Sequence, residues 1–150
     1  MQYWLMKSEP TSYSIDTLKA DTRTSWDGVR NYQARNFMRD KMQKGDKVLF
    51  YHSNTKEPAV TGVGKVCSES YPDLTQFDKK SKYYDAKATK ERPIWYLVDI
   101  CFVKKLKNPV TLTRIKAESE LKGMALVQTG FSSFRPAGRG TGVHTRSFIR

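Results

Sequence analysis

The residues best suited to hold a flat, polar ligand lie between positions 26 and 38. This stretch, WDGVRNYQARNFM, combines a tryptophan, a tyrosine, two arginines and two asparagines with a single carboxylate, Asp27. An aromatic ring can stack on a nucleobase, an amide can read its hydrogen-bonding edge, and a guanidinium group can hold a phosphate. The alternative is that these residues form only the polar start of an ordinary helix.

A second stretch, residues 71–93, alternates cationic and aromatic side chains. This alternation is typical of a groove that follows a phosphate backbone and stacks bases. Four carboxylates dilute the charge, so a solvated loop whose tyrosines cover the edge of the core is the alternative. The cationic and aromatic residues are Lys79, Lys80, Lys82, Lys87, Lys90, Arg92, Tyr71, Phe77, Tyr83 and Tyr84.

Catalytic motifs are incomplete in this sequence. Ser53–Lys56 matches Ser-x-x-Lys, but the partner motifs of penicillin-recognising enzymes do not follow. His52 and His144 offer a base for a serine, yet no Gly-x-Ser-x-Gly turn, phosphate-binding loop or His-Glu-x-x-His motif is present. We therefore expect a protein that is not an enzyme and that uses no cofactor and no metal.

Composition narrows the class of protein. The chain has 150 residues, 38% of them hydrophobic, which indicates one folded domain. Its formal charge is +12. Such a charge favours nucleic acid or another polyanion as partner, although a merely soluble basic surface is the alternative. No apolar run reaches the roughly 20 residues of a membrane span, and no signal sequence is recognisable, so we expect no membrane partner.

Cysteine usage bears on the compartment. Cys67 and Cys101 form no Cys-x-x-Cys motif, so a structural zinc site is not expected. Both lie in apolar runs, which predicts a packing role in a reducing compartment. We expect a cytoplasmic protein, nuclear in a eukaryote, that acts as a monomer.

The elements that must position these residues alternate between short helices and strands. Ser14 and Asn31 are suited to cap two helices, the second carrying Ala34, Phe37 and Met38 and ending near Gly45. A third helix is expected over residues 111–124. The predicted strands, rich in β-branched and aromatic residues, cover 3–8, 47–53, 59–68 and 94–106. This succession predicts a mixed α/β (α+β) domain with a mostly antiparallel, curled sheet or small β-barrel.

Six motifs occur in an order that resembles the EVE domain family. They are YWLMKSEP (3–10), WDGVRNYQARNFM (26–38), FYHSN (50–54), YPD (71–73), YYDAKAT (83–89) and LVQ (126–128). The resemblance implies a PUA-like fold, a small curled barrel with peripheral helices, related to the YTH and ASCH domains. It further implies binding of modified bases, either modified cytosine in DNA or modified RNA nucleotides, without turnover.

The resemblance also suggests how a pocket is lined. In the resembling fold, the first strand and the segment after Trp26 form its walls, and FYHSN closes it. Trp26 would stack on the base, while Asn31, Ser8 and Ser53 would read its edge; alternatively, Trp26 is core and Asn31 only a helix cap. Lys7, Arg30 and Arg35 would hold flanking phosphates, unless Arg30 pairs with Asp27. Trp4, at even spacing from Ser8, faces the same side of its strand. Trp95 is expected in the core.

The last twenty-odd residues depart from the family. After LVQ, EVE proteins usually continue into GSRLSVQPV, a closing strand, whereas this chain reads TGFSSFRPAG over 129–138. Allowed codons for these ten residues, read one base later, translate as QGSRLSVQPV. We therefore treat residues 1–150 as a single domain whose tail, 129–150, is read out of frame. Loss of the closing strand would leave an open barrel edge and a less stable fold.

Three functions are compatible with these residues. The first is a non-catalytic reader of a modified base in an aromatic and polar pocket. The second is an enzyme acting on a nucleotide or modified base, for which His52 or Glu9 would be the general base. The third is a module whose aromatic pocket binds a peptide.

Overall fold

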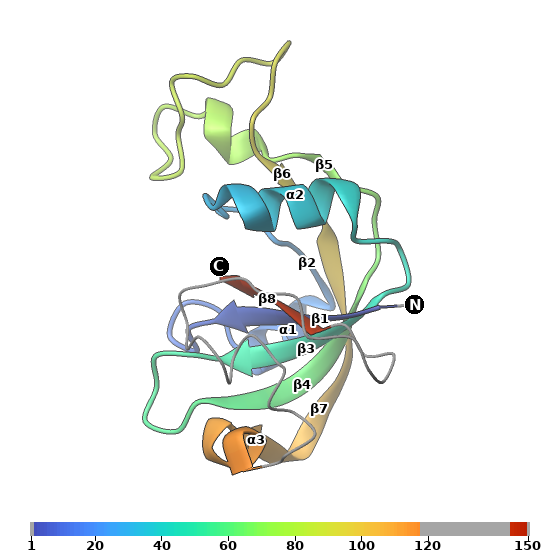
Figure 1. The fold of residues 1–150 in the computed structure, drawn as a ribbon. Coiled ribbons are helices and arrows are strands. Elements are labelled where there is room, and N and C mark those ends of the chain that lie inside the picture. The colour runs from blue at the N-terminus through green and yellow to red at the C-terminus, as the bar shows by residue number, and fades with distance from the viewer. Residues whose placement is uncertain (1, 118–144, 150) are drawn as a thin grey trace.

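The computed structural model describes residues 2–117 and the backbone of residues 145–149. Three α-helices, one 3₁₀ helix and eight strands are defined in this part of the chain (Figure 1). The helices are α1 (Ile15–Asp21), α2 (Tyr32–Asp40), η1 (Leu74–Phe77) and α3 (Leu112–Ala117). The strands are β1 (Tyr3–Ser8), β2 (Arg23–Ser25), β3 (Lys47–His52), β4 (Ala59–Val66), β5 (Tyr71–Pro72), β6 (Tyr96–Leu97), β7 (Asp99–Thr111) and β8 (Thr145–Ile149).

The main sheet has the order β2-β7-β4-β3-β1-β8. The β3–β4, β4–β7 and β2–β7 pairs are antiparallel, whereas β1 runs parallel to both β3 and β8. Register shifts in the β3–β4 and β4–β7 pairs accompany a strong curl, so that the sheet forms a half-barrel. The prediction of a mixed α/β domain with a curled, mostly antiparallel sheet is confirmed.

A smaller unit, residues 71–97, stands apart from the sheet and is called the lobe below. It contains the two-stranded β5–β6 sheet and η1, and Figure 1 shows it next to α2, on the side away from the main sheet. Gln76 forms its centre and is fully buried. The Gln76 amide donates to the carbonyls of Asp73 and Trp95 and accepts from the amides of Ile94 and Trp95. All of its hydrogen-bonding capacity therefore holds two distant chain segments together.

Local signals located both capped helices correctly. The Ser14 side chain accepts from the amide of Thr17, and the Asn31 side chain accepts from that of Ala34, as N-cap residues do. The predicted end of α2 near Gly45 is wrong, because the helix stops at Asp40 with Lys41 as C-cap. Gly45, with φ of +99°, instead makes the turn into β3.

Two other predicted elements need correction. The strand expected over 94–106 is divided, because Tyr96–Leu97 pairs within the lobe while Asp99–Thr111 joins the main sheet. The third helix begins at Leu112, and residues 118–124 of its predicted range lie outside the described residues.

Apolar clusters lie on both faces of β1. Trp4 and Met6 project into the larger apolar cluster with Trp26 and Phe50. Leu5 belongs to a second cluster, with Tyr51 and Val60, on the opposite face. This alternation is the period-two pattern of a strand buried on both sides.

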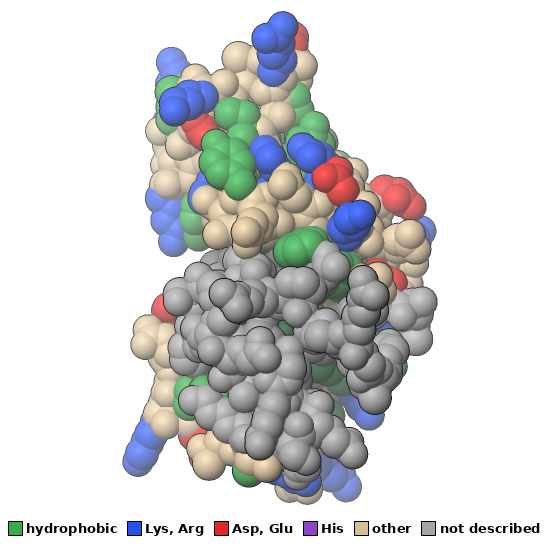
Figure 2. Space-filling view, viewed as in Figure 1, with side chains coloured by type: hydrophobic (Ala, Val, Ile, Leu, Met, Phe, Trp, Pro, Cys, Tyr) green, Lys and Arg blue, Asp and Glu red, His purple; other side chains and the backbone are tan. Residues whose placement is uncertain are grey.

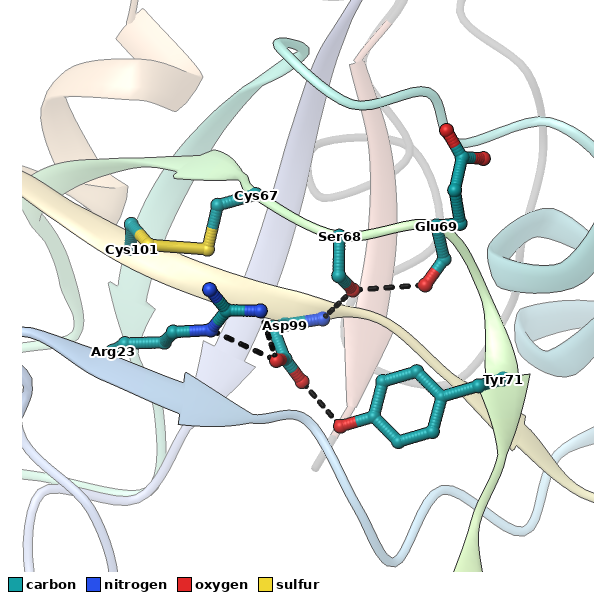
Figure 3. Close-up of a disulfide and its surroundings, with 7 residues drawn as sticks. All are labelled: Arg23, Cys67, Ser68, Glu69, Tyr71, Asp99 and Cys101. Carbon is teal, nitrogen blue, oxygen red and sulfur yellow. Dashed lines mark hydrogen bonds and ion pairs between the residues drawn. A yellow bond between two sulfur atoms is a disulfide. The ribbon is translucent and has the colours of Figure 1, made fainter.

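The expectation that the two cysteines only pack is wrong, because Cys67 and Cys101 form a disulfide (Figure 3). Cys101 lies opposite Lys65 in the β4–β7 register, and Cys67 follows β4 directly. The disulfide therefore joins two neighbouring chain segments at the base of the lobe. It also removes the cysteines as an argument for a reducing compartment.

A polar network surrounds Asp99 near this disulfide (Figure 3). Arg23 donates to Oδ2 of Asp99 at 2.7 and 2.9 Å, and the Tyr71 hydroxyl donates to Oδ1. The amide of Asp99 donates to Oγ of Ser68. This network ties β2 and β5 to the start of β7.

The tail hypothesis concerns residues 129–150, of which 129–144 and 150 lie outside the described residues. The described strand β8 pairs with β1 over Tyr3 to Lys7. That edge of β1 is therefore occupied. The out-of-frame reading itself stays a prediction.

Candidate nucleic-acid interface

The segment 26–31 is joined to the lobe through Asp73. The Asp73 carboxylate, 2% exposed, accepts from the amide of Gly28 at 2.9 Å and from Nη1 of Arg30 at 3.1 Å. Thr75 donates to the same carboxylate from its amide and its hydroxyl. Burial alone would raise the pKa of Asp73, but the hydrogen bonds from Thr75, Gly28 and Arg30 outweigh it and hold that pKa below its usual value. Asp73 is thus an ionised anchor inside the protein.

Arg30 is committed to the lobe. Its Nε and Nη2 donate to the carbonyl of Tyr83, and Nη2 also donates to Oγ1 of Thr75. Nη1 donates to the carbonyl of Val29 and to the carboxylate of Asp73. A guanidinium group has five donors, and all five are used here. The acidic partner of Arg30 is therefore Asp73 and not Asp27, the alternative that the sequence offered. A phosphate contact by Arg30 would have to displace one of these bonds.

Gly28 is the closest point of approach between the segment and the lobe. Its φ is +78°, and a Cβ at this position would lie 2.5 Å from the ring of Tyr83. Only glycine meets both conditions without strain. The residue therefore lets the Tyr83 ring lie directly on the backbone.

The structure places Trp26 in the core and Asn31 at the helix end. Trp26 is 0% exposed, its ring meets that of Phe50 edge-on at 5.7 Å, and its amide donates to Val98. Asn31 is exposed, and its carbonyl oxygen caps α2. Ligand contact by either residue stays a prediction. For Trp26 it requires that a neighbour move off the ring.

Two predicted residues, Ser8 at the end of β1 and Ser53 just after β3, are hydrogen-bonded to each other. Ser8 donates from Oγ to the carbonyl of Tyr13 at 2.7 Å, and the amide of Ser53 donates to the carbonyl of Ser8 at 3.0 Å. Trp4 donates from Nε1 to Asp46 at 2.9 Å. The structure thus brings Ser8 and Ser53 together. Trp4 packs in the same apolar cluster as Trp26.

His52 has a structural partner. Its Nε2 accepts from the amide of Ile15, the first residue of α1, at 3.1 Å. Burial lowers the pKa of His52, which Asp16 partly opposes. A neutral ring that spends its acceptor nitrogen on the backbone is poorly placed to act as a general base.

Lys7 lies on the face of β1 opposite Trp4, Met6 and Ser8. It is 2% exposed and pairs in register with Tyr51. Burial lowers the pKa of Lys7 to about 8. It is therefore not a surface cation, and the structure does not group it with Arg30 and Arg35.

Sequence reasoning missed a stack of rings and cations on the outer side of α2. The ring of Tyr32 lies 4.8 Å from that of Trp95, and Arg35 lies over Tyr32 at 4.9 Å. Arg30 lies 5.2 Å from Trp95 and 5.4 Å from Tyr83. Tyr32 was visible in the motif, but only the fold shows that Trp95, distant in sequence, supports it.

The lobe is where cations are exposed. Figure 2 shows Lys and Arg side chains around its rim. The predicted basic residues of this stretch are all exposed: Lys79, Lys80, Lys82, Lys87, Lys90 and Arg92. Within residues 2–117, no group of histidine, cysteine and acidic side chains could hold a metal ion, and no helix in the described part is long and apolar enough to cross a membrane.

Comparison with known proteins gives a consistent result. The model of the EVE domain matches residues 2–139. Thymocyte nuclear protein 1 of Gallus gallus is 48% identical over 125 residues, which cover 76% of this chain and 51% of the relative. The chain spans about half the length of the curated relatives it matches.

Two solved structures share the fold. A protein from Leishmania major is 52% identical, with a TM-score of 0.81, covering 88% of this chain and 84% of that one. The human THYN1 protein, in complex with 5-methylcytosine-containing DNA, is 40% identical with a TM-score of 0.83. That match covers 93% of this chain and 92% of the human one.

Proposed function

Since the chain belongs to the EVE domain family, we propose that it binds nucleic acid and recognises a modified base without altering it. The observation that supports this most directly is the 40% identity, over nearly the whole chain, to a human protein crystallised with 5-methylcytosine-containing DNA. Modified cytosine in DNA is therefore the first candidate, and a modified RNA nucleotide the second. The proposed place of action is the cytoplasm or, in a eukaryote, the nucleus.

The proposed base-binding residues come from β1, from the segment 26–31 and from the residue that follows β3. Trp26 and Trp4 would supply aromatic surface, and Ser8, Ser53 and Asn31 would supply hydrogen-bonding groups. Arg35 and the exposed cations of the lobe would contact phosphates. Arg30 and Asp73 act in this proposal by holding the lobe in place.

The absence of turnover is also a proposal, and the state of the two candidate bases supports it. Nε2 of His52 accepts a hydrogen bond from a backbone amide, and Oε1 of Glu9 accepts one from Nδ2 of Asn54 at 3.3 Å. Within the described residues, no hydrogen bond joins either side chain to a serine, threonine or cysteine that it could activate as a nucleophile. Prolonged incubation with modified and plain oligonucleotides should leave them unchanged. Turnover that disappears on His52→Ala or Glu9→Gln would favour an enzyme instead.

Binding is tested by fluorescence polarisation with labelled oligonucleotides. Matched DNA strands, single and duplex, carry either cytosine or 5-methylcytosine at one position, and an RNA series repeats the design. Tighter binding of the methylated DNA is the expected result. Equal affinity for both cytosines would contradict base recognition, and a preference for modified RNA would assign the protein to RNA.

A further inference from the structure

Tyr32 is an exposed ring with an unusual support. It is 56% exposed at the first position of α2, whereas Trp95 beneath it is 4% exposed. The two ring centroids are 4.8 Å apart and the planes are inclined by 31°. An isolated exposed tyrosine is ordinary, but a tyrosine seated on a buried tryptophan is held in one orientation.

The support itself is rigid. Trp95 donates from Nε1 to Oδ2 of Asp85 at 2.8 Å, and Gln76 binds its amide and its carbonyl. Arg30 covers another part of its ring at 5.2 Å. Gln76 therefore fixes the backbone of Trp95, and the indole cannot turn without breaking its hydrogen bond to Asp85, so the surface beneath Tyr32 is ordered.

One side of the Tyr32 ring is covered by neither Trp95 nor Arg35. The guanidinium carbon of Arg35 lies 4.9 Å from the Tyr32 ring centre, and Trp95 lies 4.8 Å from it. If these groups occupied opposite faces, they would be separated by nearly the sum of those two distances. They are only 6.0 Å apart, so both lie toward one side of the ring. Neither group covers the other side of the ring, and the residue as a whole is exposed.

The charge around this ring fits a nucleic-acid strand. Arg35 uses Nε and Nη1 within the protein, for Asn36 and for the carbonyl of Ile94. Its Nη2 makes no hydrogen bond to the part of the chain described here. An aromatic platform beside an available cation is the arrangement that stacks a base and holds its phosphate.

We propose that Tyr32 is a second stacking platform, which binds an unpaired base on the same strand as the recognised nucleotide while Arg35 contacts the adjoining phosphate. This inference rests on the proposed function, because it assumes that the strand passes from the Trp26 region. The six residue-to-residue steps from Trp26 to Tyr32 span at most about 20 Å, and a stacked strand rises about 3.4 Å per nucleotide. The platform is thus within about six nucleotides of the recognised base.

The length of the ligand separates the two sites. Tyr32→Ala should weaken binding of a single strand of about 13 nucleotides, modified at its centre, by about 5- to 150-fold. Tyr32→Phe should retain most of the affinity, because the stacking face remains. Binding of the modified nucleoside alone should not change, because it does not reach the platform. Gln33→Ala, an exposed neighbour on α2, is the matched control and should behave as wild type.

Two further readouts make the assignment specific. The ratio of affinities for methylated and unmethylated strands should be unchanged in Tyr32→Ala, since the platform reads no modification. Arg35→Gln should lower the slope of log affinity against log salt by about 0.7–0.9, whereas Tyr32→Ala should leave that slope unaltered. DNA and RNA strands run in parallel distinguish the two sources of the base.

The outcomes decide between the proposals. Unchanged strand affinity in a folded Tyr32→Ala protein would overturn the platform while leaving base recognition intact. A wild-type protein that binds strands without preferring the methylated one would overturn base recognition, and the Tyr32 effect on unmodified strands would still support the platform. A wild-type protein that binds no strand would overturn both.

Discussion

The Asp73 carboxylate and the Arg30 guanidinium lie 3.1 Å apart where the lobe meets the segment 26–31. Asp73 is 2% exposed and Arg30 23%, so water screens this pair only weakly. The same carboxylate oxygen also receives the amide of Gly28. One acidic side chain therefore binds two residues of the most distinctive motif of the sequence, Gly28 and Arg30, to the cationic lobe.

Replacing Asp73 with asparagine should loosen this attachment. Asp73→Asn keeps the size of the side chain but leaves Arg30 and Gly28 with a weaker acceptor, so we expect a loss of about 1–3 kcal/mol in unfolding free energy. Urea denaturation measures it. Because the folded pKa of Asp73 is lowered, its contribution is present above the unfolded value of about 3.9 and is lost as pH falls below it. Asp78→Asn, at an exposed position, is the control, and an equal loss there would contradict the role of Asp73.

His52 should make stability depend on pH under milder conditions. Burial lowers its folded pKa, so the folded state binds fewer protons than the unfolded state below the usual value of about 6.5. Stability should therefore be full above that pH and should decline as pH falls toward the lowered folded value. Thermal melts between neutral pH and about pH 5 test this. His52→Gln should flatten the profile in that range, and an unchanged slope in the variant would assign the titration to another group.

Trp26 should affect stability and binding differently in two variants. Because the side chain is 0% exposed, Trp26→Ala should cost about 3–5 kcal/mol of stability. Trp26→Phe preserves an aromatic ring and is the variant in which binding can be measured. If a base stacks on Trp26, the intrinsic fluorescence of the wild type should be quenched by ligand. Stacking contributes about 1–3 kcal/mol to binding, and Trp26→Phe should lose part of that contribution. A stable Trp26→Phe protein with wild-type affinity would remove this ring from the site.

The exposed lysines of the lobe should govern the salt dependence of binding. Each lysine that contacts a phosphate contributes about 0.7–0.9 to the slope of log affinity against log salt. Lys79→Gln with Lys80→Gln should therefore lower the slope. The paired control, Lys104→Gln with Lys107→Gln on β7, removes the same charge away from the lobe. Equal effects of the two pairs would mean that only net charge matters.

Reduction of the disulfide should destabilise the fold. Cys67 and Cys101 are separated by 34 residues, and closing a loop of this size stabilises a protein by about 2–4 kcal/mol. Denaturation with and without a reducing agent measures the difference. The Cys67→Ala, Cys101→Ala double variant should be insensitive to the reducing agent. Two reactive thiols in the wild-type protein purified without reductant would argue against the disulfide.

Local chemistry made much of the fold predictable. Strand 3–8 and the caps Ser14 and Asn31 depend on residues within a few positions of one another, and all three are confirmed. The family motifs identified the fold class because they are spread along most of the chain, from residue 3 to residue 128. The break at Val98 was not predictable in this way, because it arises where one continuous apolar run leaves the lobe for the main sheet.

The candidate site was less predictable, since its geometry depends on distant partners. Nothing in the motif around Arg30 indicates that Asp73 would engage it, or that Trp95 would lie beneath Tyr32. Even-and-odd spacing on β1 does separate Lys7 from Ser8, so that part was available from the pattern. The pairing of the cysteines required the register of β4 and β7.

The position of the disulfide has a consequence for a protein that has been cut. Cys67 and Cys101 flank the whole lobe, and the exposed lysines and arginine of residues 79–92 lie within the covalent loop that they close. A trypsin-like protease that cleaves there would separate the polypeptide into two chains, yet the fragments would stay linked. Such a nicked molecule migrates as one species without reductant and as two with it. A single backbone cut between Cys67 and Cys101, which includes the whole lobe, therefore releases no fragment until the disulfide is reduced.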